Sequence, residues 1–127
     1  MRLFIVRHAK AAPGAPDELR PLTEDGRAAA RDLGKRLAGE RLDAVVSSPL
    51  LRARETAEAI ARAAGLELEI DERLTPGADA TAVRALVQGR GETVVVVGHQ
   101  PDCSEIVLEL TGRQVPFATG AFLEVAL

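Results

Sequence analysis

Two uninterrupted apolar runs most constrain the fold of this chain. Leu3 to Val6 and Val94 to Val97 contain no polar residue, which is typical of strands that are buried on both faces of a sheet. Ala44 to Val46 and Leu66 to Ile70 are predicted as further strands. We expect the two fully apolar strands to be central in the sheet.

Helical patterns separate these predicted strands. The clearest begins with Ser48 as cap and Pro49 in the first helical position, and its apolar residues recur at three- and four-residue spacing until Gly65. Its charged residues Arg54, Glu58 and Arg62 are predicted to form the solvated side. Three further helices are predicted: from about Thr23, over Ala80 to Val87, and from Pro101 to about Leu110.

The alternation of strands and helices predicts an α/β fold. We expect a three-layer sandwich with a mainly parallel central sheet and helices on both faces. Phe122 to Leu127 is predicted as a final edge strand, with an antiparallel orientation as an open alternative. The length of 127 residues and the 46% hydrophobic content suit a single domain over residues 1–127.

Charge and cysteine content narrow the choice of partner and compartment. A formal net charge of −3 argues against nucleic acid and anionic membranes as partners. The single cysteine, Cys103, excludes an intramolecular disulfide and fits a reducing compartment. The apolar run before Arg7 is too short for a signal peptide, and no run approaches the roughly 20 apolar residues that span a bilayer. We therefore expect a cytoplasmic protein.

Basic and imidazole side chains follow three of the predicted strands. Arg7 and His8 follow the first strand, Arg52 follows the second, and His99 follows the fourth. The carboxyl ends of parallel strands share one edge of the sheet, where ligands bind in such folds. The sequence thus predicts a cluster of guanidinium and imidazole groups at this edge. The alternative is that each histidine is only a polar residue that ends a strand.

Such a cluster suits a phosphoryl group. A guanidinium group binds two phosphate oxygens with its planar fork, and like-charge repulsion from two arginines would lower the pKa of a nearby histidine and keep it neutral. Other phosphate chemistries lack their motifs: no Walker-type loop follows the first strand, and Glu109 stands where a phosphatase using Cys103 needs arginine. Adjacent arginines repel a divalent cation, so neither a metal nor another cofactor is expected.

Three short motifs contain the candidate residues. They are Arg7-His8-Ala9-Lys10-Ala11, then Ser48-Pro49-Leu50-Leu51-Arg52 with Thr56, and Val97-Gly98-His99-Gln100-Pro101. Together with Pro21-Leu22-Thr23, Gly26 and Thr119-Gly120, they resemble the histidine phosphatase superfamily, and within it the short SixA-like phosphohistidine phosphatases. The resemblance covers nearly the whole chain.

The resemblance implies a phosphoglycerate mutase-like fold and a phosphatase that needs no metal. His8 would be the nucleophile and form a phosphohistidine intermediate, while Arg7, Arg52 and His99 would bind the phosphoryl oxygens and stabilise the charge of the transition state. The implied substrate is phosphohistidine on a signalling or phosphotransfer protein. Ala9 stands where many members have glycine, so its backbone must adopt a conformation open to alanine.

The proton donor for the leaving group is the least determined part of the site. In larger relatives it is a carboxylate on an inserted segment, but only eight residues separate Ile70 from Asp79 here. Glu72 and Asp79 are candidate general acids, with a solvated loop charge and a helix cap as their alternative roles. Asp17 and Glu18 are no better placed.

The short segment favours a phosphohistidine protein as substrate. A protonated imidazole leaves readily, whereas an alkoxide depends on a positioned acid. Two alternatives remain open from the sequence: a small-molecule phosphomonoesterase of the same fold, and a phosphate-binding module with weak or no catalysis. The oligomeric state is also left open.

Overall fold

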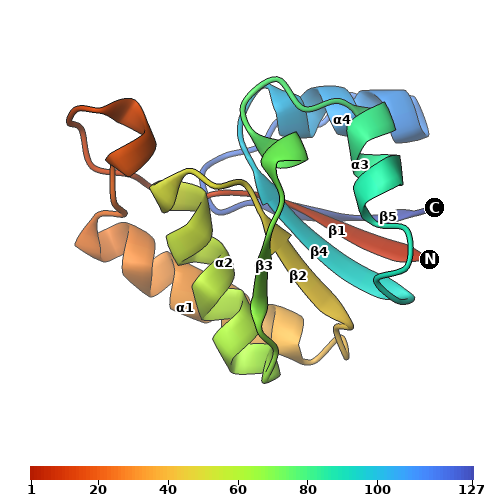
Figure 1. The fold of residues 1–127 in the computed structure, drawn as a ribbon, viewed down its shortest axis with the longest axis horizontal. Helices are drawn as coiled ribbons and strands as arrows, with labels where there is room; N and C mark the ends of the chain where they lie inside the picture. The colour runs from red at the N-terminus through yellow and green to blue at the C-terminus, as the bar shows by residue number, and fades with distance from the viewer.

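The computed structural model describes residues 1–127 and places one five-stranded sheet between two layers of helices (Figure 1). The strand order is β3-β2-β4-β1-β5. The first four strands are parallel, and β5 runs antiparallel to β1 at one edge. This confirms the predicted fold class and settles the orientation of the last strand. The strands are β1 (Arg2–Arg7), β2 (Ala44–Ser47), β3 (Leu68–Ile70), β4 (Thr93–Gly98) and β5 (Phe122–Ala126).

The helices divide between the two faces of the sheet. Figure 1 shows α1 and α2 on one side and α3 and α4 on the other. None of them is long and apolar enough to cross a membrane. The elements are α1 (Glu24–Ala38), α2 (Leu51–Ala64), α3 (Ala80–Leu86) and α4 (Asp102–Thr111), with two short 3-10 helices, η1 (Asp17–Leu19) and η2 (Glu72–Leu74).

The apolar strands supply both halves of the core. Leu3 and Ile5 of β1 belong to the cluster beneath α3 and α4, whereas Phe4 and Val6 belong to the cluster beneath α1 and α2. The four valines of β4 alternate in the same way, because successive side chains of a strand point to opposite faces. All of these side chains are buried, so the central position predicted for the two strands is confirmed.

The starts of α2 and β3 each differ from the prediction by two residues, while other element ends differ by about one. Helix α2 begins at Leu51 and not at Pro49 with Ser48 as cap, because the Ser48 hydroxyl accepts the Leu50 amide at 3.2 Å in a turn that precedes the helix. Strand β3 begins at Leu68 and not at Leu66, because the Leu66 amide donates to the Ala61 carbonyl and closes the end of α2. Hydrogen bonds to neighbouring turns thus shorten both elements.

The strand register brings three strand ends to one level. Arg7 pairs with Gly98, and Ser47 pairs with Val97. The His8 amide then donates to the Gly98 carbonyl at 3.1 Å, which extends the ladder by one bond. The first residues beyond β1, β2 and β4 therefore lie next to one another at the carboxyl edge of the sheet, where parallel sheets bind ligands.

Candidate active site

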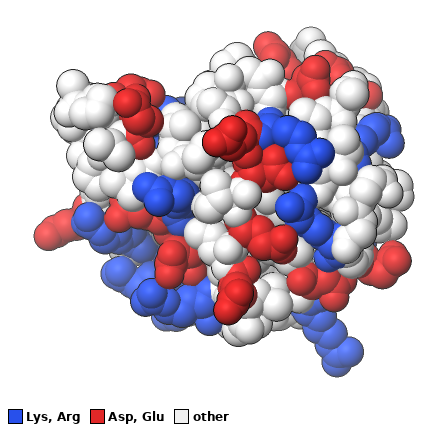
Figure 2. All heavy atoms as spheres, viewed as in Figure 1, with Lys and Arg blue, Asp and Glu red and all other residues white.

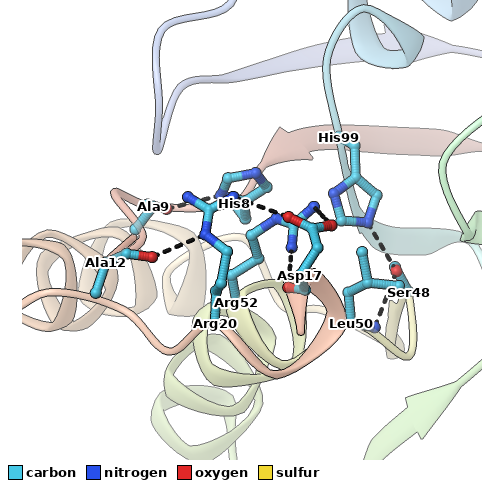
Figure 3. A network of polar contacts seen from close by, with 9 residues as sticks. All are labelled: His8, Ala9, Ala12, Asp17, Arg20, Ser48, Leu50, Arg52 and His99. Carbon is cyan, nitrogen blue, oxygen red and sulfur yellow. Dashed lines mark hydrogen bonds and ion pairs between the residues drawn. The ribbon is translucent and has the colours of Figure 1, made fainter. Parts of the chain in front are cut away.

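The structure brings the two histidines of the chain together at the carboxyl edge of the sheet (Figure 3). The ring centroids of His8 and His99 lie 5.4 Å apart, and the ring planes are inclined by 56°. Both residues are buried. They form one site with Arg7 and Arg52, as the position of each residue after its strand predicts.

His8 is held with one ring nitrogen free. Its Nδ1 lies 2.7 Å from the Ala9 carbonyl oxygen, and since a carbonyl only accepts hydrogen bonds, Nδ1 carries the proton and the lone pair of the neutral ring is on Nε2. Burial lowers the pKa of His8 below its ordinary value of 6.5, and the charges of Arg52, Arg7 and Arg20 lower it further. The sequence predicts the direction of this pKa shift, but its first cause is desolvation and not charge repulsion.

Thr56 ties the nucleophile segment to α2. Its Oγ1 accepts the Ala9 amide at 3.0 Å and donates to the Arg52 carbonyl at 2.8 Å. Thr56 is fully buried, so it holds Arg52 and the nucleophile segment together and does not lie on the exposed face of α2. The Ala9 methyl packs against Leu22 and Ala30, and its backbone has no positive φ, which explains why alanine fits where many relatives have glycine.

Arg7 is anchored through one end of its guanidinium group. One terminal nitrogen donates to the Phe117 carbonyl at 2.8 Å, while Nε is buried without a hydrogen-bond partner. The loop before β5 is fixed against the same segment, because the Gly120 amide donates to the carbonyls of Arg7 and His8. Gly120 has a φ of 75°, a conformation that favours glycine.

Arg52 presents its fork to Asp17 of η1. The terminal nitrogens of Arg52 donate to the Asp17 carbonyl at 2.9 Å and to its Oδ2 at 3.2 Å. Arg20 donates to the other carboxylate oxygen at 3.0 Å and, through Nε, to the Ala12 carbonyl at 2.8 Å. These bonds, first from Arg20 and then from Arg52, lower the pKa of Asp17, so an ionised carboxylate occupies the guanidinium fork of Arg52.

His99 faces Ser48 with one nitrogen and leaves the other free. Its Nε2 lies 2.8 Å from the Ser48 hydroxyl oxygen, and its Nδ1 is buried without a partner. Burial lowers the pKa of His99 to about 4, assisted by the charges of His8 and Arg52. His99 is therefore neutral at physiological pH.

The two candidate general acids lie outside this hydrogen-bonded cluster. Glu72 is exposed in η2, and Asp79 accepts the Ala82 amide at 2.9 Å as the cap of α3. Neither carboxylate forms a hydrogen bond or ion pair with His8, Arg7, Arg52 or His99. The cap role that the sequence offers for Asp79 is confirmed, and a role of either residue as general acid stays a prediction.

Cys103 contributes to packing. It is buried in the core beneath α3 and α4, and its Sγ donates to the Val6 carbonyl at 3.6 Å. Burial raises the pKa of this thiol to about 12, so it is protonated and a poor nucleophile. Cys103 is therefore a packing residue of the core and not part of the site.

The contact between the Asp17 carboxylate and Arg52 was not predicted from the sequence. Asp17 reaches Arg52 across 35 positions through an irregular loop, and no periodic pattern in the sequence marks that contact. The only available signal was that two acidic residues follow His8 in a Pro- and Gly-rich stretch.

Comparisons with known proteins agree with this geometry. Residues 3–75 match the family model described as the histidine phosphatase superfamily (branch 1). Phosphohistidine phosphatase SixA of Escherichia coli is 34% identical over 138 residues, covering all of this chain and 86% of that protein. A solved structure of the protein histidine phosphatase SixA with tungstate has a TM-score of 0.88 at 33% identity, covering 100% of this chain and 88% of that one.

A second solved structure extends the similarity. The putative phosphohistidine phosphatase SixA from Agrobacterium tumefaciens has a TM-score of 0.82 at 28% identity, covering 97% of this chain and 89% of that one. The resemblance in the three sequence motifs is thus confirmed over the full length of the chain. The chain belongs to the histidine phosphatase superfamily (branch 1), is similar throughout its length to the SixA phosphatases, and is a phosphatase.

Proposed function

We propose that this phosphatase removes the phosphoryl group from phosphohistidine on a signalling or phosphotransfer protein, with His8 as nucleophile. The observation that carries the proposal is the neutral His8 ring, with its lone pair on Nε2, beside His99 and two guanidinium groups. Residues 1–127 act as one catalytic domain in this proposal, and the reaction takes place in the cytoplasm.

The proposed reaction has two transfers. The Nε2 lone pair of His8 attacks phosphorus in line, the bond from phosphorus to the substrate imidazole breaks, and the departing nitrogen takes up a proton. Water then attacks the phosphoryl group on His8, the bond between phosphorus and Nε2 breaks, and inorganic phosphate leaves. The net reaction consumes one water and returns neutral His8, with no metal or other cofactor in either step.

Buried polar atoms without partners support an anion at this site. Arg7 Nε and His99 Nδ1 are both buried and unpaired, and each unpaired group costs about 1–3 kcal/mol. Where the Ser48 hydroxyl donates to His99 Nε2, the neutral ring carries its proton on Nδ1 and can donate it to a phosphoryl oxygen. A bound phosphoryl group would accept a hydrogen bond from each of these two nitrogens. Such donors stabilise the negative charge on the equatorial oxygens of the phosphoryl group.

Asp17 competes with the phosphoryl group for Arg52. Its side chain is 61% exposed, and an ion pair with so exposed a carboxylate contributes little to stability because water screens the charges. A phosphoryl dianion binds the same fork with greater charge. We therefore expect the ion pair between Asp17 and Arg52 to break when substrate binds.

The substrate class follows from the leaving group. An imidazole is protonated near neutral pH and departs without a strong acid, whereas an alkoxide needs a positioned proton donor. Glu72 and Asp79, the candidate donors, make no contact with the cluster. The names of the SixA relatives support the same substrate class, and one of these relatives is known in complex with tungstate, an oxyanion.

A substrate comparison tests the proposal. The purified protein is assayed on a phosphotransfer domain phosphorylated on histidine, on free phosphohistidine, and on a panel of sugar and nucleotide monophosphates. We expect kcat/KM for the phosphohistidine protein to exceed that for every ester by about 100-fold or more, and alkaline quenching to trap acid-labile phosphate on His8 Nε2. Faster turnover of an ester would establish a phosphomonoesterase instead, and phosphate binding without turnover would establish a binding module.

The pH dependence of the reaction follows from the pKa shift of His8. Because burial lowers this pKa below 6.5, the attacking ring is neutral at pH 7 and becomes protonated only in more acidic solution. We expect kcat/KM to be level near neutrality and to fall about tenfold per pH unit below the His8 pKa.

Ring NMR gives the reference for this profile, since the chain has only two histidines. The acid midpoint of kcat/KM should coincide with the His8 titration, and His99 should titrate near pH 4. A rate that increases on acidification would rule out a neutral imidazole as the attacking group, and a His8 midpoint above 6.5 would contradict the lowered pKa.

A further inference from the structure

A large cavity of the molecule lies outside the candidate active site. It is a groove of about 790 Å³ between α1 and α2, extended by β3 at the sheet edge. Its floor is apolar and includes Ala30, Ala59, Ala63, Leu68 and Ile70. Ile70 is 45% exposed, and few other large apolar residues are exposed anywhere on the molecule. We call this feature the α1–α2 groove.

Basic side chains line the α1–α2 groove. Arg27, Arg31 and Lys35 recur every four residues along α1, so they follow one face of the helix at intervals of about 6 Å. All three are exposed, and none of their side chains forms a hydrogen bond or ion pair. Figure 2 shows basic side chains gathered at the lower left, where Figure 1 places α1.

The opposite wall adds further positive charge. Arg54 and Arg62 of α2 line the groove, and only Arg62 has an ion pair, with Glu58 at 3.2 Å. In total, five basic and two acidic side chains line the groove, a net charge of +3 in a chain whose formal net charge is −3. The groove therefore has the opposite charge to the molecule as a whole.

Helix α2 connects the groove to the candidate active site. Leu51 lines the groove, and the next residue, Arg52, holds the phosphate-binding fork. One turn further along α2, the carboxylate of Glu55, the residue before Thr56, accepts the Leu22 amide at 2.7 Å. A partner that lies in the groove would thus extend alongside the residues that we propose to bind the phosphoryl group.

We propose that the α1–α2 groove binds an acidic amphipathic helix of the phosphohistidine protein. This inference rests on the function proposed above and identifies the part of the substrate that is recognised outside the reacting group. Carboxylates four residues apart on a helix repeat at the same interval as the α1 cations, and apolar side chains between them would cover the floor. The apolar floor and the two glutamates disfavour a nucleic acid backbone, so charge complementarity selects an acidic protein surface.

A double charge reversal tests this docking surface. Arg31→Glu with Lys35→Glu changes two exposed side chains that have no partners. We expect KM for the phosphorylated phosphotransfer domain to increase at least about tenfold, while kcat on this protein and turnover of free phosphohistidine stay unchanged. In the unmodified protein, this KM should also increase between 0.05 and 0.5 M NaCl, and the double variant should lose most of that salt dependence.

A matched control separates the groove from net charge. Arg84→Glu with Arg113→Glu makes the same change of net charge at exposed side chains that lie outside the groove and have no ion pair. This control should change KM by less than about twofold. An equal increase in both double variants, or none in either, would overturn the docking proposal while leaving the proposed function intact.

Two further results also decide the question. Absence of His8-dependent turnover on both phosphohistidine substrates would overturn the proposed function and the docking proposal together. A dimer in solution that dissociates in the Arg31→Glu, Lys35→Glu variant would identify a second copy of this chain as the occupant, and would overturn the docking proposal alone. Thermal unfolding of both double variants verifies that they are folded.

Discussion

Replacing His8 with alanine is expected to abolish turnover and to leave much of the phosphate affinity in place. The substitution removes the only atom proposed to bond to phosphorus, Nε2, so kcat should fall by more than about 10⁴-fold. Arg7, Arg52 and His99 remain to bind an oxyanion. Stopped assays on a phosphohistidine protein measure the first effect, and calorimetric titration with phosphate or tungstate measures the second.

His8→Asn provides a sharper control. The asparagine amide can still donate to the Ala9 carbonyl, as Nδ1 does at 2.7 Å, but asparagine has no atom equivalent to Nε2. This variant should be as inactive as His8→Ala and should form no acid-labile phosphoenzyme. Turnover by either variant near the rate of the unmodified protein would refute nucleophilic attack by His8.

Much of the fold was predictable because its signals are local. The continuous apolar runs in β1 and β4 identify strands buried on both faces, and the three- and four-residue apolar spacing identifies α2. The errors lie at element ends, where a tertiary contact competes with a local pattern. Serine is a residue type that commonly caps helices, yet the Ser48 hydroxyl forms a hydrogen bond with His99, which lies 51 positions away in the sequence.

The site was predictable to the extent that the sheet determines it. The parallel register of β1 and β4 places His8 beside His99 without any further information. The orientation of each side chain depends on irregular loops, and these carry no periodic signal. The Asp17 contact with Arg52 and the burial of Thr56 were therefore missed.

The reason for a glycine at position 26 could not be predicted from the sequence either. Gly26 belongs to the residues that carry the family resemblance, but the sequence gives no reason for a glycine inside α1. In the structure, a Cβ at Gly26 would lie deep inside van der Waals contact of the Lys10 carbonyl oxygen. The glycine thus permits α1 to approach the segment that follows the nucleophile, a contact between two parts of the fold that only the folded chain reveals.

Replacing Arg52 with alanine is expected to weaken both catalysis and phosphate binding. Arg52 lies in the first turn of α2 and is 7% exposed, and its guanidinium group donates through two nitrogens to Asp17. We propose that the same fork binds two phosphoryl oxygens. Loss of such a donor costs about 10²- to 10³-fold in kcat, and the affinity for phosphate or tungstate should fall by tenfold or more. Arg84→Ala, at an exposed position of α3, serves as control and should change neither value.

Arg52→Lys separates charge from geometry. Lysine keeps the positive charge but cannot bind two oxygens with a planar fork, so its kcat should lie between those of the alanine variant and the unmodified protein. Full activity of the lysine variant would show that charge alone is used. Unchanged phosphate affinity in Arg52→Ala, measured by titration, would show that Arg52 acts only in the transition state. Because Asp17 is largely exposed, releasing it from Arg52 leaves no buried unpaired charge, so a loss of activity in a variant with unaltered thermal unfolding reports on the phosphoryl group itself.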